Sequence, residues 1–485
     1  MSLPLTSLRL SGHRPYQRLK RLLFATLLAV LFIVVCVVKP LRKFAVYYTV
    51  SFIPASINDS DRPPSYTNLR EWEQNLPQHD LDLPFPEGKT GRYVLFSSSR
   101  VELLGWNNKL IMVLMDSWLA YKSNRTYVFH DFAWSDKHYP WPAHKFREWT
   151  PHTPLNALIS GPSVGGAWED GDLSPRAVSN QWFDVVCPKA ERRYINTHDV
   201  KPAIYWEDGA VIFAHWQKIL IEAPERCIEV VAPSLKEDAY PQIFDLYLWG
   251  STRSLSLWEE FKSSPVSRLL TASKIVDFAI ENNEPLFLPR GQRPLTTTIS
   301  ETPFDRVISI HIRRGDFKTK CRDFWTWSST FYSWNLLPFL PDRFDPPPGS
   351  SWGGNTEENL PIYIDRCYPE IPALLDKVKA TREGFVSSAQ PGELAYLDTV
   401  YIMTNDRTPW LDDLKAALKA DGWRMVITSN DLTLNAEQKD VGMAIDMEIG
   451  RRSAVFIGNG WSSFSSNVVH QRLVDGREPI SIRFL

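Results

Sequence analysis

Cysteine is scarce in this 485-residue chain, which has only five, and no two of them have the Cys-x-x-Cys spacing typical of zinc sites. An excess of charge of one sign is also absent, since 54 Lys and Arg residues against 56 Asp and Glu residues give a net charge of -2. Without a basic excess there is no case for nucleic-acid binding. The length is sufficient for two domains, and with 44% hydrophobic residues most of the chain is expected to fold.

One long apolar run stands near the N-terminus. Residues 22–38 carry no charge and would span roughly 25 Å as a helix, which suits a thin ER or Golgi bilayer. Five basic residues precede this run and three follow it, so the N-terminus is expected in the cytosol. We therefore predict a cytosolic tail at 1–21, a transmembrane signal anchor at 22–38 and a lumenal body, that is, a single-pass type II protein of the Golgi or ER membrane. A cleaved signal peptide is the alternative, but Lys39-Pro40 is a poor cleavage context.

Two features agree with a lumenal body. Asn58-Asp-Ser60 and Asn124-Arg-Thr126 match the acceptor pattern for N-glycosylation. Cys36 lies inside the apolar run, which leaves an even number of cysteines for the lumen and allows two disulfides in three possible pairings. Four free buried thiols remain the alternative. The simplest pairing joins sequence neighbours, Cys187 with Cys227 and Cys321 with Cys367.

The pattern of apolar residues predicts an α/β body after a stem. Residues 39–88 are rich in Pro, Ser, Asp and Asn, as in a stem that holds a domain away from a membrane. Strands that alternate with short helices indicate parallel, doubly wound sheets. The segment 317–397 is too long for a plain connection and is interpreted as an insertion beside the site. The expected strands lie at 92–96, 126–129, 227–232, 307–312, 400–404, 424–428 and 454–457, and the clearest helices at 106–121, 408–421, 440–452 and 462–473.

The stretch Val307–Phe317 combines a buried strand with a polar, positively charged turn. Apolar residues run directly into His311, Arg313, Arg314 and Asp316. In open α/β sheets, ligands bind at the carboxyl ends of the strands, and adjacent arginines there favour a planar anion such as a phosphate. Because neighbouring residues at a strand end face opposite ways, Arg314 is also open to a structural role.

A second candidate segment follows the last predicted strand. Gly458 and Gly460 would let the backbone approach a ligand, and Ser462, Ser463 and Ser465 open a helix whose N-terminal amides could bind a diphosphate. Simple capping of the helix by serine explains the same residues equally well.

A carboxylate on the preceding helix, Asp446, could accept hydrogen bonds from a guanine edge or a ribose. The alternative is a solvated charge on a helix surface.

Taken together, these segments resemble the protein O-fucosyltransferase superfamily. The motif His-x-Arg-Arg-Gly-Asp-Phe at 311–317 is followed by Thr404-Asn-Asp406, Ala444-Ile-Asp446, Phe456-Ile-Gly458 and Ser462-Ser-Phe-Ser465. The pattern is most similar to the thrombospondin-repeat branch and covers roughly 300–475, while the N-terminal half matches only at 93–96 and 105–108. The resemblance implies a GT-B architecture with a Rossmann-like domain on the acceptor side at 89–295. A second such domain, on the nucleotide-sugar side, would occupy 296–485 and contain the insertion 317–397.

The resemblance also implies a reaction: transfer of fucose from GDP-fucose to a protein or glycan hydroxyl, with inversion and without an essential metal or other cofactor. In this interpretation Arg313 holds the diphosphate and stabilises the departing GDP, and Asp446 binds the guanine. The other implied donor-binding residues are Asn107, His311, Ser462, Ser463 and Phe464.

The catalytic base is where this sequence departs from the family pattern. Inversion needs a group that takes the proton of the acceptor hydroxyl. The branch resembled most has a Glu immediately before its Gly-Phe-Asn motif, whereas Leu104 precedes Gly105-Trp-Asn107 here and Glu102 lies two residues further back. Glu102 is the candidate base.

Three other functions stay open. A non-catalytic lumenal protein that binds a nucleotide or a sugar would keep Asp446 and the serines without needing Glu102. A related transferase could use another nucleotide sugar. A metal-dependent glycosyltransferase of a different fold would need an Asp-x-Asp clamp, a pattern that Asp80-Leu-Asp82 and Asp170-Gly-Asp172 match.

Overall fold

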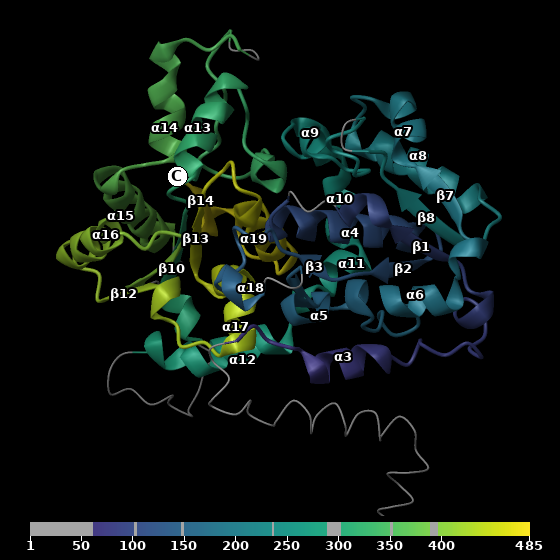
Figure 1. Cartoon of the computed structure of the whole chain (residues 1–485). Coiled ribbons are helices and arrows are strands. Elements are labelled where there is room, and N and C mark those ends of the chain that lie inside the picture. The colour runs from purple at the N-terminus through teal and green to yellow at the C-terminus, as the bar shows by residue number, and fades with distance from the viewer. Residues whose placement is uncertain are drawn as a thin grey trace, which may run out of the picture. The chain divides into compact units, whose positions relative to one another are not determined.

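Two five-stranded parallel sheets form the body of the protein (Figure 1). The structure is a computed structural model that describes residues 62–485, with gaps at 101–103, 147–149, 235–236, 289–301, 350–352 and 389–395. All described residues belong to one unit, which begins at Ser60. The strands of the first sheet lie between Tyr93 and Val231 and those of the second between Val307 and Phe484. The domain boundary at 295 stays a prediction.

The first sheet has the strand order β6-β2-β1-β8-β7, and every pairing in it is parallel. Its central strand β1 pairs with β2 on one side and with β8 on the other. Helix α4 (Trp106–Lys122) links β1 to β2, and every residue from Lys109 to Ala120 is buried, so the helix is enclosed on all sides there. The strands are β1 (Tyr93–Phe96), β2 (Thr126–Phe129), β6 (Val178–Ser179), β7 (Arg193–Asn196) and β8 (Cys227–Val231).

The second sheet has the order β12-β11-β10-β13-β14, again with parallel pairings throughout. Alternate residues of β10 face opposite layers, as the pleat of a strand requires. Ile308, Ile310 and Ile312 pack with α15 and α16, while the other face of the sheet packs with α18 and α19. The strands are β10 (Val307–Ile312), β11 (Thr399–Thr404), β12 (Met425–Thr428), β13 (Val455–Gly458) and β14 (Ile482–Phe484).

Helices of differing length connect and cover the sheets. In the N-terminal half they are α3 (Thr67–Gln74), α5 (Leu155–Leu158), α6 (Asn180–Val186), α7 (Thr197–Val200), α8 (Gly209–Glu222), α9 (Leu246–Trp249), α10 (Trp258–Ser263), α11 (Pro265–Arg268) and α12 (Lys274–Asn283). In the C-terminal half they are α13 (Phe317–Thr326), α14 (Leu360–Cys367), α15 (Ile371–Ser388), α16 (Pro409–Ala420), α17 (Ala436–Asp440), α18 (Gly442–Arg452) and α19 (Ser463–Val474). The two-residue strands β3 (Phe132–Ala133) and β4 (His152–Thr153) pair with each other, as do β5 (Ile159–Ser160) and β9 (Thr271–Ala272).

The predicted stem at 39–88 is too long. Residues from 62 onward belong to the folded body, because α3 packs on it and Tyr66 is buried. The hydroxyl of Tyr66 donates to the Asp440 carboxylate at 2.9 Å, and Gln78 donates to the Ala177 carbonyl at 2.7 Å. The polar and proline-rich composition predicted an extended stem, but contacts with residues distant in sequence fold this segment onto the body.

The predicted insertion at 317–397 also needs correction. Helix α15 lies in this range, but it is the crossover between the neighbouring parallel strands β10 and β11. Its Leu374 and Val378 are buried against the isoleucines of β10. The segment before α15, with α13 and α14, is the part that extends beyond the sheet and helix layers (Figure 1).

The membrane anchor stays a prediction. Residues 1–21 and 22–38 lie outside the described part of the chain, as do the remainder of the stem to 61 and the acceptor residue Asn58. Within the described ranges, no helix combines the length and the apolar composition that crossing a membrane requires.

Asn124 occupies an exposed turn between α4 and β2, with a left-handed backbone φ of 49°. Asparagine adopts this conformation more readily than most residues do. Its position leaves room for a glycan, and glycosylation itself stays a prediction.

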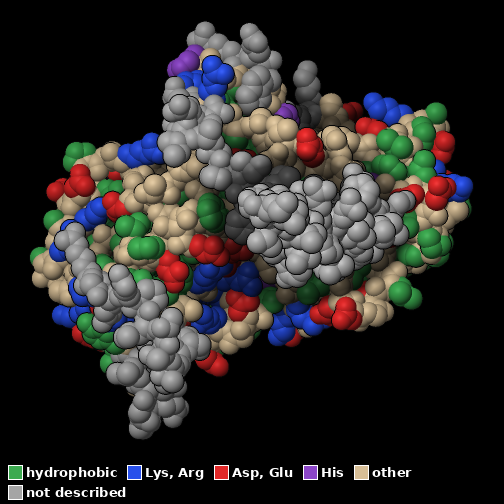
Figure 2. Space-filling view, turned by 90° about the horizontal axis from the view of Figure 1, so that it is seen from below, with side chains coloured by type: hydrophobic (Ala, Val, Ile, Leu, Met, Phe, Trp, Pro, Cys, Tyr) green, Lys and Arg blue, Asp and Glu red, His purple; other side chains and the backbone are tan. Residues whose placement is uncertain are grey.

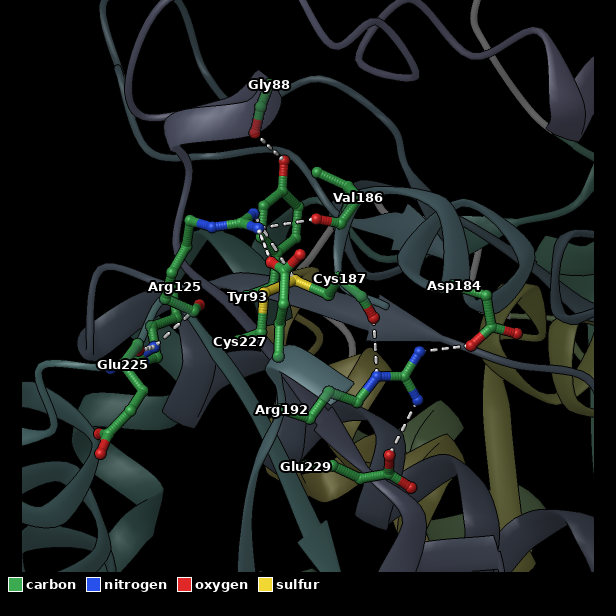
Figure 3. Close-up of a disulfide and its surroundings, with 12 residues drawn as sticks. Gly88, Tyr93, Arg125, Asp184, Val186, Cys187, Arg192, Glu225, Cys227 and Glu229 are labelled. Carbon is green, nitrogen blue, oxygen red and sulfur yellow. Dashed lines mark hydrogen bonds and ion pairs between the residues drawn. A yellow bond between two sulfur atoms is a disulfide. The ribbon is translucent and has the colours of Figure 1, made fainter. Parts of the chain in front are cut away.

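Two disulfides join sequence neighbours, Cys187 to Cys227 and Cys321 to Cys367. The first ties the end of α6 to the start of β8 (Figure 3). Beside it, Arg192 donates to the Cys187 carbonyl at 2.8 Å, pairs with Glu229 at 3.0 Å and also pairs with Asp184. The second disulfide holds α13 against α14.

Charged side chains of both signs alternate over the described part of the face seen in Figure 2 and do not gather in one basic region. A polar cavity of about 320 Å³ illustrates the same balance. There Arg451 pairs with Asp475 at 2.6 Å, and Arg452 pairs with Asp277 at 2.6 Å and with Glu448 at 2.8 Å. Since these cations and anions neutralise one another, the cavity offers no charge excess to a ligand.

Arg472 is a fully buried cation that holds several backbone segments together. Its guanidinium donates to the carbonyls of Gly450 and Ala454 at 3.0 and 2.9 Å, and to the side chain of Ser481 at 2.9 Å. The bonds join the end of α18, the start of β13 and the approach to β14.

Replacing Arg472 by Met is expected to lower the free energy of unfolding by about 3 kcal/mol or more, because buried carbonyls lose their donors. Chemical denaturation measures this change. The matched control Arg193→Met removes an arginine that is 42% exposed and paired with Glu225, and should cost less than about 1 kcal/mol. Equal losses in the two variants would contradict this account of Arg472.

Candidate donor site at the strand ends of the second sheet

The strand order of the second sheet places a topological switch point at β10. The chain leaves β10 toward β11 on one side, while β13 pairs on the other side. Ile310 lies opposite Ile457, so the turn after β10 and the loop after β13 begin at neighbouring strand ends. Ligands of doubly wound proteins bind outside the strand ends at such a point. The sequence segments 311–316 and 458–465 therefore meet at one edge of the sheet.

His311 contributes a buried, neutral imidazole to this edge. Its Nδ1 lies 3.1 Å from the hydroxyl oxygen of Ser465, and its ring lies 4.4 Å from the ring of Phe464. Burial, and to a lesser extent the charge of Arg313, lowers the pKa of His311 to about 3. The ring can thus line a pocket and offer a hydrogen bond without adding positive charge.

The two arginines of the turn have separate environments. Arg313 comes directly after β10; it is about one-third exposed and pairs with Asp316 at 3.2 Å. Asp316 is 61% exposed, so this ion pair is weak and an incoming phosphate can compete with it. Gly315 has a φ of 64° and completes the turn between them.

Arg314 packs in the layer of α16, on the other side of the sheet from His311. Its guanidinium lies 3.8 Å from the Tyr368 ring centroid and 3.9 Å from that of Trp410, and it donates to the Pro369 carbonyl at 3.0 Å. Its backbone N–H donates to Asn405 at 2.9 Å. Because the side chain of Arg314 is buried in these contacts, its role is structural. Arg313 is then the cation of this turn that a ligand can reach.

The N-terminus of α19 is capped by its own serine. The Ser462 hydroxyl accepts from the Phe464 N–H at 3.2 Å, and the Ser465 hydroxyl accepts from the Asn459 N–H at 2.9 Å. Ser462 and Ser463 remain half-buried, so ligand atoms can still reach them. Phe464 is buried against His311. Capping and anion binding are compatible here, because a cap satisfies only some of the first-turn amides.

The glycines of this loop serve packing within the protein. A Cβ atom on Gly460 would lie 2.2 Å from the Phe331 ring, and one on Gly458 would lie 2.9 Å from the Cβ of Ser465. Sequence reasoning had assigned both glycines to close approach of a ligand. The structure shows instead that they let the loop lie directly against neighbouring side chains.

Asp446 lies half-buried on α18, over the same face of the sheet as His311. Ser429 donates to its two oxygens at 2.8 and 2.7 Å, and the Tyr401 hydroxyl donates to Oδ1 at 2.5 Å. Burial raises the pKa of Asp446 to about 6 despite these bonds. A carboxylate has further lone pairs, so Asp446 can still accept from a ligand.

The N-terminal half contributes Asn107 in the first turn of α4. Asn467 of α19 donates to its carbonyl at 2.9 Å, and Tyr332 donates to the neighbouring Asn108 at 3.0 Å. The first bond joins the start of α4 to α19, and the second joins it to the segment that follows α13. Glu102, the predicted base, lies outside the described residues.

The acidic pairs considered for a metal clamp lie in turns. Asp80 and Asp82 are exposed, as is Asp170, while Asp172 accepts from Tyr121 at 3.0 Å. Within the described ranges, no group of three or more His, Cys, Asp or Glu side chains is arranged to hold a metal ion.

Sequence reasoning missed several supports of this site. Tyr401 and Ser429 hold Asp446, and Asn459, which is buried, fixes the loop before α19 by donating to the Cys367 carbonyl at 2.7 Å. A polar residue directly after a predicted strand was the available signal for Ser429. Tyr401 lies inside a strand, where it is indistinguishable from a core residue.

Comparison with models of known protein families finds no match, and a search of curated proteins also finds none. Among solved structures, the chain is similar to POFUT1 in complex with GDP-fucose, with 16% identity and a TM-score of 0.46 over 79% of this chain and 94% of that chain. It is also similar to a variant of Arabidopsis thaliana FUT1 in complex with GDP (10% identity, TM-score 0.34, 89% of this chain and 77% of that chain). A third is NodZ alpha-1,6-fucosyltransferase soaked with GDP-fucose (12% identity, TM-score 0.33, 78% of this chain and 89% of that chain). At this level of identity, the residues of this chain must carry any conclusion about function.

The raised pKa of Asp446 makes stability depend on pH in a defined direction. Because its folded-state pKa of about 6 lies above its ordinary value, protonation favours the fold. This contribution is fully present below about pH 4 and is lost as the pH rises through 6. Asn resembles the protonated form, so the wild type should lose stability relative to Asp446→Asn between pH 4.5 and 7. Denaturant unfolding at several pH values measures the difference.

The exposed position Asp412 provides the control for this test, since Asp412→Asn also removes one carboxylate. If the stability difference between wild type and Asp446→Asn stayed constant over this pH range, burial would not raise the pKa of the Asp446 carboxyl group.

Proposed function

We propose that this protein is an inverting glycosyltransferase that transfers fucose from GDP-fucose to a hydroxyl of a protein or glycan and needs no metal. The observation that carries the proposal is the joint position of Arg313, the start of α19 and Asp446. Arg313 and the start of α19 follow the adjacent strands β10 and β13 at the switch point of the second sheet, and Asp446 lies on α18, which packs on the sheet face that α19 also covers. A cation and helix amides suit a diphosphate, and a half-buried carboxylate suits the N–H groups of guanine.

The same residues define how the donor would react. The acceptor oxygen attacks C1 of the fucose, the bond from C1 to the β-phosphate oxygen breaks, and its electron pair stays on GDP. Arg313 and the first-turn amides of α19 stabilise the negative charge that develops on the leaving phosphate. His311 lines the pocket as a neutral imidazole and adds no charge of its own next to the leaving phosphate. Asn107 lies on the acceptor side, where α4 meets α19.

The proton of the acceptor hydroxyl goes to a base, for which we propose Glu102. Glu102→Gln should then lower kcat by about 100-fold or more while GDP affinity stays within about twofold. Single-turnover transfer and GDP titration measure the two quantities. Unchanged kcat would remove Glu102 from the mechanism and leave the donor site untouched.

A type II topology would place this reaction in the lumen of the Golgi or ER, with the membrane bound through residues 22–38. The two disulfides support that compartment, since it is oxidising.

Arg313→Ala should weaken GDP binding by about 10- to 100-fold, because one charge-assisted contact to phosphate is lost. Calorimetry with GDP measures this effect, and transfer should fall at least as far. Arg322, an exposed arginine of α13, is the matched control, and Arg322→Ala should bind GDP like the wild type.

The same titrations separate the alternatives. Unchanged GDP affinity in Arg313→Ala would contradict the donor site. Normal GDP binding with no transfer to any acceptor would instead favour a non-catalytic nucleotide-binding protein. Loss of transfer in EDTA would show that a metal is needed after all.

A further inference from the structure

A cavity of about 300 Å³ lies in the first sheet's half of the protein, and none of the proposed steps uses it. One face of α4 forms a wall, with Trp106, Lys109 and Asp116 at helical spacing. The other walls follow the carboxyl ends of β1 and β2 and include Ser99 and Asp131. A cavity at the strand ends of a parallel sheet is where a ligand is expected.

The cavity contains buried polar groups that internal contacts hold in place. Asp116 is 2% exposed and accepts from the Ser99 hydroxyl at 2.7 Å. Lys109 is buried and donates to the Ser99 carbonyl. Arg70 pairs with Asp131 at 2.7 Å. These charged groups of the lining are thus engaged with other groups of the protein, which favours an uncharged ligand over a phosphate or another ion.

One buried donor of this wall has no acceptor in the part of the chain that the structure describes. The indole N–H of Trp106 has no hydrogen-bond partner among the described residues, although the side chain is only 3% exposed. Buried polar groups are normally satisfied, so an orphaned donor beside a cavity points to a ligand or water that accepts from it. The aromatic rings of Tyr127 and Phe132 also line the space and offer apolar contact.

We propose that this cavity binds one uncharged sugar ring of the acceptor, so that the acceptor is a glycan. A sugar ring combines hydroxyl groups, which match Trp106, Lys109 and Asp116, with C–H faces that match the aromatic rings. The volume lies at the small end of ligand pockets, which suits a single ring. This inference rests on the proposed function for its biological meaning, although sugar binding itself can be tested alone.

Two further observations support the assignment. Burial raises the pKa of Asp116 to about 7, so near neutral pH its carboxyl group can donate to a hydroxyl as well as accept from one. Trp106 also precedes Asn107, whose carbonyl accepts from Asn467 of α19. The helix that forms the cavity wall thus contacts the helix that would bind the donor phosphates.

The test uses the full-length protein in detergent and saturation-transfer NMR with methyl glycosides of glucose, galactose, mannose and N-acetylglucosamine. At least one glycoside should bind. Ala133→Phe places a ring at the cavity wall and should weaken that binding about tenfold or more. Trp106→Phe keeps the aromatic body but removes the N–H, and should weaken it by a smaller factor.

Trp216→Phe is the matched control, because Trp216 is a buried tryptophan whose N–H also lacks a partner among the described residues but which does not line the cavity. It should bind the glycoside like the wild type. Failure of every glycoside to bind, or binding that survives both Ala133→Phe and Trp106→Phe, would overturn the inference.

GDP titration of the same samples distinguishes this failure from failure of the proposed function. GDP binding without glycoside binding refutes only the sugar cavity. Glycoside binding without GDP binding leaves the cavity standing and refutes the transferase.

Discussion

The parallel pairing of β10 with both β11 and β13 is the constraint on which the candidate site depends. Because the chain departs from β10 to one side and returns on the other, the turn at 313–316 and the loop before α19 begin at adjacent strand ends. The bond between His311 and Ser465 joins these segments across that edge. Asp446 reaches the same face because α18 packs there, with Tyr401 and Ser429 holding its carboxylate.

The burial of Arg314 then decides which arginine is available. Arg313 stays one-third exposed in the turn, whereas Arg314 lies against the rings of Tyr368 and Trp410. Adjacent residues with the same charge therefore have different surroundings: Arg313 is accessible at the strand ends, and Arg314 is part of the packing of α16 and the segment before α15. The start of α4 completes the arrangement by contacting α19, which connects the first sheet and its cavity to the proposed donor site.

Local patterns in the sequence predicted those helices and strands whose apolar residues repeat with a clear helical or strand spacing. The apolar strands at 126–129 and 307–312 appear at the predicted residues, and α4 and α16 lie where the helical spacing and the first-turn proline indicate. These patterns failed where contacts between residues distant in sequence decide the local structure. The segment 62–88 has a stem-like composition but is ordered by partners such as Asp440, and α15 was hidden inside an apparent insertion. The supports of Asp446 and the packing role of Gly460 depend on residues distant in sequence, which a single chain does not reveal.

The central claim is that a guanine nucleotide diphosphate binds at the strand ends of the second sheet. Its most direct test is a calorimetric screen of the full-length protein against GDP, GDP-fucose, GDP-mannose, UDP and UDP-sugars. We predict that GDP and GDP-fucose bind, and that UDP and UDP-sugars bind at least about tenfold more weakly, since uracil has fewer N–H donors for Asp446. Absence of GDP binding, or equal binding of UDP and GDP, would contradict the account.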